Sequence, residues 1–165
     1  MTLYAITIPV FARYLTNLSA ILKKGARHAA KRKWGDKKLL SMRLAPDMYN
    51  LTGQVQYAYF TALEAATKLS GRPSPEFAYD EATVKELQKS LSRTIAFLKT
   101  IKPNELEQGR GKKVGTFLLS PKQRVTKEQY ATALALPNFF FHVATAYDIL
   151  RHAGVTIGKD DYLGA

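Results

Sequence analysis

The stretch LPNFFFHVATAYDILRHAG, residues Leu136–Gly154, gives the clearest indication of the fold. At about 100° per residue, steps of three and four place five of its residues on one helical face, namely Asn138, His142, Thr145, Ile149 and His152. Phe139 and Phe140 widen the apolar surface, and a helix that is apolar over most of its circumference is covered on several sides. We therefore predict a core helix that ends at Gly154, where a left-handed residue can close it.

Two further signals lie at the start and in the middle of this helix. Thr126-Lys-Glu-Gln129 fits a capping box, in which the Thr126 hydroxyl and the Gln129 side chain satisfy free amide groups at a helix start. Pro137 lies inside the run, and an internal proline removes a helical hydrogen bond and clashes with the preceding turn. We expect a kink at Pro137 or a break into two helices.

The N-terminal helix is predicted from near Leu3 or Pro9 to about Lys24, because apolar residues recur there at intervals of three and four. Gly25 follows two lysines, which is typical of a helix end. Alternatively the helix continues through Gly25, at a cost of about 1 kcal/mol relative to alanine, with residues 26–32 as its extension. Both interpretations stay open at this point.

Two more helices are expected in the middle of the chain. An apolar stripe predicts one over Leu51–Leu69, and a capping box at Thr83–Glu86 opens another that reaches about Ile101. Val114–Leu119 then has strand propensity and is followed by a turn signal. The predicted fold class is all-α, an up-and-down four-helix bundle with a small β-hairpin or extended excursion between its third and fourth long helices.

Length and composition limit the class of protein. The 165 residues suit one domain, 1–165, and a hydrophobic content of 46% with nine Tyr and eight Phe supports a real core. The absence of cysteine excludes disulfides, thiolate metal sites and a cysteine nucleophile. Residues 1–12 lack the basic leader of a signal peptide, and no uncharged apolar run approaches the roughly 20 residues of a spanning helix. We expect a soluble, cytoplasmic protein.

The formal net charge of +12 is unevenly placed. Residues 1–46 contain ten Lys and Arg against the single acid Asp36, which gives +9 and leaves +3 for the other 119 residues. Such a region can attract anions, although a solvated helix face that aids solubility explains it equally well. No nucleic-acid-binding motif accompanies these charges, so we do not expect nucleic acid to be the partner.

Several segments together resemble a bacterial family known only as a domain of unknown function. They are Leu136–Val155, Gly158–Gly164, Thr7–Phe11, Leu18–Leu22 and Arg43–Met48. That family in turn resembles the DinB/YfiT-like superfamily of four-helix bundles, often described as metalloenzymes. The resemblance implies the same bundle, pairing into homodimers, and a site of three histidines for a divalent metal, one on the second long helix and a His-x-x-x-His pair on the fourth.

Carried over position by position, the resemblance puts Gln56, Asn138 and His142 where the three histidines are expected. Gln54 lies close by and is the alternative on the second long helix. Neutral amides are weak ligands for zinc or nickel. The metal site is therefore expected to be degenerate, with no cofactor assigned and with His142 as the one remaining ligand if a metal binds at all.

Three functional hypotheses follow, and the sequence leaves open whether the protein is an enzyme. The first is a non-catalytic bundle whose small-molecule pocket is lined by Gln56, Asn138 and His142, or in which these residues form only a buried hydrogen-bonded cluster. The second is a metal-dependent hydrolase or thiol transferase, for which His28 and His152 are poorly placed to supply further ligands. The third is anion or nucleic-acid binding through the basic N-terminal region, residues 13–43.

Overall fold

A computed structural model describes all residues, 1–165, and shows a bundle of four long helices. Three of them are single α-helices: α1 (Leu3–Lys31), α3 (Leu51–Ser70) and α4 (Val84–Thr100). The fourth runs without interruption through α6 (Lys127–Gln129), the π-helix η1 (Tyr130–Ala135) and α7 (Leu136–His152). The chain also contains three short helices, α2 (Asp36–Leu40), α5 (Pro103–Glu107) and α8 (Lys159–Leu163).

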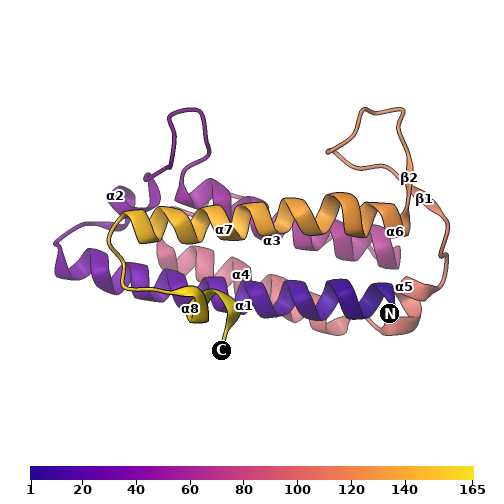
Figure 1. The fold of residues 1–165 in the computed structure, drawn as a ribbon, viewed down its shortest axis with the longest axis horizontal. Coiled ribbons are helices and arrows are strands. Elements are labelled where there is room, and N and C mark those ends of the chain that lie inside the picture. The colour runs from indigo at the N-terminus through magenta and orange to yellow at the C-terminus, as the bar shows by residue number, and fades with distance from the viewer.

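A small hairpin connects α5 to the fourth long helix. Its strands are β1 (Lys113–Val114) and β2 (Val125–Thr126), which pair antiparallel with Val114 opposite Val125. The loop between them extends over the bundle at the top right of Figure 1. The predicted all-α bundle with a hairpin before its last long helix is confirmed.

Hydrogen bonds at the two ends of the bundle fix the directions of the helices. The first amide of α4, Val84 N–H, donates to Asp36 in α2, just beyond the end of α1. Leu3 N–H at the start of α1 donates to Glu107 in α5, just beyond the end of α4. Arg72, directly after α3, also binds a carboxylate of α5. The helices α3 and α4 therefore run in the same direction, antiparallel to α1 and α7 (Figure 1).

One connection thus departs from strict up-and-down alternation. The segment 71–83 carries the chain from the end of α3 back along the bundle to the start of α4. A helix of 20 residues such as α3 is about 30 Å long. Thirteen extended residues span up to about 43 Å, so this linker has the reach that the parallel arrangement requires.

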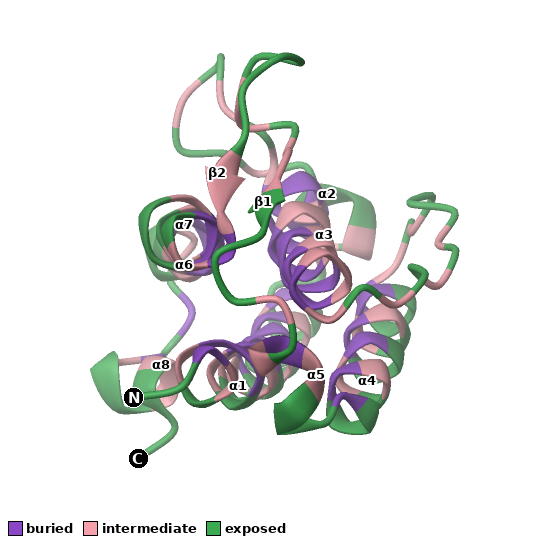
Figure 2. Cartoon of the chain, turned by 90° about the vertical axis from the view of Figure 1, so that its right-hand side faces the viewer, coloured by how far each residue is buried: buried purple, intermediate pink, exposed green.

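The core forms where the four long helices face one another. It contains 35 buried hydrophobic residues, most of them from the four long helices. Figure 2 shows these buried positions turned inward along each helix, with exposed positions outside. Phe11 of α1 and Phe139 of α7 meet edge to face, with ring centroids 4.8 Å apart. The helix predicted over Leu136–Gly154 therefore packs in the core, as its apolar residues predict.

The structure settles the end of the first helix, because α1 continues through Gly25 to Lys31. A Cβ atom added at Gly25 would lie 2.9 Å from Cδ2 of the buried Leu150 in α7. The glycine is therefore a point of close approach between two helices. The role of Gly25 is therefore steric. Of the two interpretations, the helix that continues through Gly25 is the correct one.

Pro137 neither breaks nor ends the fourth helix. The six-residue π-helical segment η1 lies immediately before it, and Pro137 takes a position in the first turn of α7. The N–H of Leu136 donates to the main-chain oxygen of Ala131, five residues earlier, so the wider π-type turn ends directly before the residue that has no N–H to donate. The capping box predicted at Thr126 and the one at Thr83 are both present.

Two helices, Leu3–Lys31 and Lys127–His152, are long and apolar enough to cross a membrane by length and composition. Both are packed in the bundle, and the core helix of a soluble protein meets the same criterion. Packing therefore accounts for their apolar character. The cytoplasmic location stays a prediction.

The close approach at Gly25 yields a test of the packing. Gly25→Val should lower the free energy of unfolding by about 1–3 kcal/mol, because the added methyl groups overfill the contact with Leu150. Ala20→Val on the same helix, at an exposed position, should cost only a few tenths of a kcal/mol. Urea unfolding of the two variants measures the difference, and equal losses would contradict this account of Gly25.

Candidate functional site

Polar side chains meet in the interior between α3 and α7. His142 Nδ1 lies 2.7 Å from Gln54 Oε1, and both residues are buried, with 6% and 1% of their surface exposed. The ring of Tyr57 stacks on the ring of His142, with centroids 5.2 Å apart and an interplanar angle of 21°. His142 is therefore held by a hydrogen bond along its edge and by an aromatic ring on its face.

The orientation of the Gln54 amide determines which nitrogen of His142 carries the proton. Gln54 Nε2 donates to the main-chain oxygen of Tyr49 at 3.2 Å, and a carbonyl oxygen can only accept. Gln54 Oε1 consequently faces His142, so Nδ1 of His142 is the donor. The other ring nitrogen, Nε2, keeps its lone pair and makes no hydrogen bond within the chain, yet it is not sealed from solvent.

Burial keeps this histidine neutral. Loss of solvation lowers the pKa of His142 from 6.5 to about 4, because the charged imidazolium is disfavoured in a buried position. At neutral pH the side chain therefore presents an accepting Nε2 and carries no charge.

Asn138 lies one helical turn before His142 but is engaged elsewhere. Its Nδ2 donates to Thr61 Oγ1 at 2.8 Å, and Thr61 in turn donates to the main-chain oxygen of Tyr57 at 2.7 Å. This chain of bonds ties α7 to α3. Asn138 thus belongs to the same interface as His142, but it makes no hydrogen bond to the imidazole.

Gln56 lies outside this interface, and Gln54 takes the place beside His142. Two positions along a helix are separated by about 200°, so Gln54 and Gln56 point to different sides of α3. Gln56 instead donates to the main-chain oxygen of Tyr79 at 3.0 Å and to Glu81 Oε2 at 2.8 Å. The three residues expected to share one pocket are therefore divided between the interior and the outer side of α3.

These residues do not fit a resident divalent metal. No group of three or more His, Cys, Asp or Glu side chains is placed to hold one. Gln54 and Asn138 already use their amides in hydrogen bonds with Tyr49, His142 and Thr61. A single imidazole with committed neighbours is a hydrogen-bonding group rather than a metal centre.

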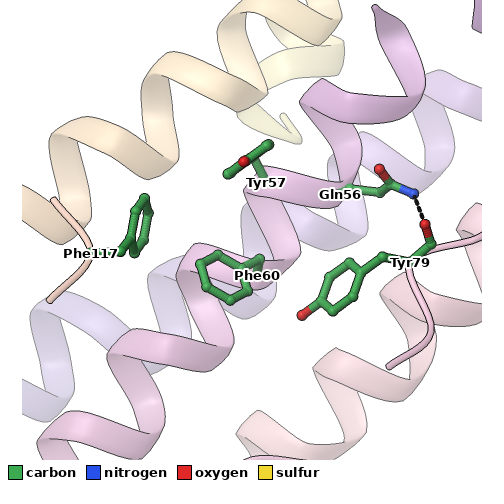
Figure 3. Close-up of a pocket in the computed structure, with 5 residues that line it drawn as sticks. All are labelled: Gln56, Tyr57, Phe60, Tyr79 and Phe117. Atoms are coloured by element: carbon green, nitrogen blue, oxygen red, sulfur yellow. Dashed lines mark hydrogen bonds between the residues drawn. The ribbon is translucent and has the colours of Figure 1, made fainter. Parts of the chain in front are cut away.

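A cavity of about 440 Å³ lies on the outer side of α3. It is lined by four aromatic residues and one amide, namely Tyr57, Phe60, Tyr79, Phe117 and Gln56 (Figure 3). Phe60 lies at its centre, with ring centroids 5.2 Å from Phe117, 6.0 Å from Tyr79 and 6.2 Å from Tyr57. Tyr57 also stacks on His142, so one ring separates the cavity from the polar interior.

Two loops bring the outer walls of this cavity into place. Tyr79 comes from the 71–83 linker, and its ring lies parallel to that of buried Tyr59 at 5.4 Å. Phe117 comes from the hairpin loop, where the neighbouring Thr116 donates to Glu64 Oε2 at 3.1 Å. The same carboxylate oxygen accepts from Tyr130 in the π-helical segment at 2.9 Å. Glu64 on α3 therefore connects the hairpin loop, the π-helix and the cavity wall.

A half-buried carboxylate lies directly behind Gln56. Glu81 accepts hydrogen bonds from Tyr59, Ser90 and Gln56. Burial by itself would raise the pKa of Glu81, but these hydrogen bonds outweigh it and hold the pKa below its usual value. Glu81 is thus ionised at neutral pH, and none of the ion pairs in the chain includes it.

The sequence carried partial signals for these features. Gln54 lies on the same helical line as Ala58, Thr61 and Ala65, all of them buried, which marks that line as interior. Tyr79 and Phe117 have no comparable local signal, because they reach the cavity only through the paths of two loops.

Comparisons with known proteins agree with this fold. Residues 3–163 match the family described as a domain of unknown function, DUF1993. The chain is also similar to the crystal structure of a DinB family member protein from Shewanella denitrificans, with a TM-score of 0.93 and 34% sequence identity, over 99% of this chain and 92% of that one. Among curated proteins, no sequence matches the chain.

The neutral state of His142 yields a pH prediction. Below pH 6.5 the unfolded chain binds a proton that the folded chain takes up only near pH 4, so stability falls as the pH is lowered through this window. The loss attributable to His142 should be about 2 kcal/mol between pH 6.5 and 4.5.

Urea unfolding at several pH values measures this loss. The wild type and His152→Gln, which alters an exposed histidine at the end of α7, should both show the decline. His142→Gln should show a flatter profile. An equal decline in His142→Gln would mean that other groups cause it.

Proposed function

The chain belongs to the DUF1993 family, a DinB-like four-helix bundle, and we propose that it binds a small molecule with an apolar body in the aromatic cavity beside α3. The observation that carries this proposal is the cavity itself, about 440 Å³ walled by four aromatic residues. Its size and apolar lining are those of pockets that bind small ligands, which usually combine apolar walls with a few polar groups. Gln56 is the polar group here.

The arrangement favours binding over metal chemistry. Hydrolysis or thiol transfer at a metal needs several ligands and an open position. Around His142 the two neighbouring amides are hydrogen-bonded, and no cluster of three ligating side chains exists. The histidine, tied to Gln54 and stacked on Tyr57, instead supports the wall of the cavity from behind.

The test has two arms, both on the full chain purified without added metal. Plasma mass spectrometry should find well below one equivalent of zinc, nickel or iron per chain. Titration with the neutral fluorescent probe N-phenyl-1-naphthylamine should show saturable binding that Phe60→Ala weakens about tenfold, because Phe60 is the central ring of the cavity.

Phe141→Ala is the matched control, since Phe141 is an exposed aromatic residue that does not line the cavity. It should leave probe binding unchanged. Near-stoichiometric metal that disappears in His142→Ala would favour the metalloenzyme hypothesis instead. Probe binding that is indifferent to Phe60→Ala would reject the cavity as the binding site.

A second candidate function is binding of an anion at the basic end of α1. Lys24, Arg27, His28 and Lys31 follow one another at intervals of three, one and three residues and line a small cavity of about 140 Å³ together with Val155 and Thr156. Lys24 pairs with Asp161 at 2.5 Å, whereas Arg27 and Lys31 take part in no ion pair. Two unpaired cations beside a hydroxyl favour a small phosphate-like anion.

Retention on heparin tests this second candidate. Arg27→Gln with Lys31→Gln should elute at distinctly lower salt than the wild type, because unpaired charges at the cavity are lost. Lys85→Gln with Lys99→Gln removes the same charge from the exposed face of α4. Equal shifts for both pairs would indicate net charge alone.

The homodimer stays a prediction. Tyr49 and Phe141 each expose 53% of their surface, and large exposed apolar residues of this kind are common at contacts between subunits.

A further inference from the structure

We propose that the ligand of the aromatic cavity is an organic cation, an ammonium group with at least one N–H on an apolar body. This inference rests on the proposed function and specifies its ligand. It follows from the rings of the cavity, the free oxygen of Gln56 and the unpaired charge of Glu81.

The rings of the cavity favour positive charge. The face of an aromatic ring carries negative electrostatic potential, and a cation within about 6 Å of the ring centroid is attracted to it. Tyr57, Tyr79 and Phe117 are set at interplanar angles of 80°, 71° and 58° to Phe60. At such angles some rings present a face and others an edge to the cavity. Figure 3 shows Phe60 between Phe117 and Tyr79.

The Gln56 amide has a fixed orientation. Both hydrogens of its Nε2 are used, one by the main-chain oxygen of Tyr79 and one by the carboxylate of Glu81. Neither partner can donate, so the amide cannot be reversed without losing both bonds. Gln56 Oε1 is left without a partner in the chain and is not buried. The one free hydrogen-bonding atom of this amide is therefore an acceptor, which suits an N–H donor and opposes a carboxylate.

The charge behind Gln56 has the matching sign. Glu81 is ionised and accepts three hydrogen bonds but has no cationic partner. Glu81 lines a neighbouring cavity together with Lys89 and Arg93, but neither cation pairs with it, and the Arg93 guanidinium lies over Phe77 at 4.5 Å. A bound ammonium near Gln56 would bring positive charge close to a carboxylate that has hydrogen bonds but no ion pair within the chain.

The backbone at Tyr79 indicates that this arrangement is enforced. Tyr79 has a φ of 56°, a left-handed conformation that is unfavourable for a bulky non-glycine residue. Such conformations persist where the surroundings over-determine them, often at binding sites. At Tyr79 the conformation directs the carbonyl to Gln56 while the ring forms a wall of the cavity.

Three probes with the same ring and different head groups test the inference. Isothermal titration calorimetry would compare 2-phenylethylammonium, 2-phenylethanol and 3-phenylpropionate on the full chain at neutral pH. The ammonium should bind about tenfold or more tightly than the carboxylate, with the alcohol between them. Equal binding of all three, or a preference for the carboxylate, would overturn the inference and leave the proposed function intact.

The neutral naphthylamine probe separates the two levels of the proposal. If it binds while none of the three phenyl probes does, the cavity is a site but the ligand class is wrong. If it also fails, the proposed function fails with the inference.

Matched variants locate the source of the preference. Glu81→Gln should weaken ammonium binding several-fold with little effect on the alcohol, because it removes the charge and keeps the size of the side chain, at the loss of one accepting oxygen. Asp80→Asn removes an exposed neighbouring carboxylate that makes no contact with Gln56, and it should change neither. Phe60→Leu, which keeps an apolar side chain without a ring, should also reduce the ammonium preference, so the test does not depend on one variant.

Equal loss of ammonium and alcohol binding in Glu81→Gln would show that Glu81 acts only by shaping the site. A full ammonium preference in both Glu81→Gln and Phe60→Leu would contradict the electrostatic origin argued above.

Discussion

The hydrogen bond between Gln54 and His142 governs the interior between α3 and α7. Both groups are buried, and a buried polar group without a partner is costly, so each needs the other. Because the Tyr49 carbonyl fixes the Gln54 amide, one main-chain oxygen determines the tautomer of a histidine on another helix. The interior is thereby satisfied by hydrogen bonds among neutral groups, and it contains no group of three His, Cys, Asp or Glu side chains that could hold a metal ion.

Two glutamines only two positions apart serve opposite sides of α3. Gln54 completes the neutral interior, whereas Gln56 stands between an ionised carboxylate and an aromatic cavity. Tyr57, the residue directly after Gln56, contacts both regions through its ring. The hydrogen-bonded inner side of the helix thus lies directly behind the proposed binding surface, and rigid support from behind is what a precise site requires.

Local signals were sufficient for much of the fold. The capping boxes at Thr83 and Thr126 and the periodicity of the long helices depend on residues close in sequence, so they were predictable. The role of Gly25 depends on Leu150, and the division between Gln54 and Gln56 depends on which side of α3 meets α7. Such features follow from contacts between distant segments, which a single sequence does not specify.

The 71–83 linker has an implication for how such proteins diverge. A tight turn between α3 and α4 would hold few side chains, but a connection that travels the length of the bundle carries Tyr79 and Glu81 to the outer side of α3. Loops tolerate substitution and changes in length better than packed helices do. Substitutions in this segment can therefore change the lining of the cavity while the helices and their core stay the same.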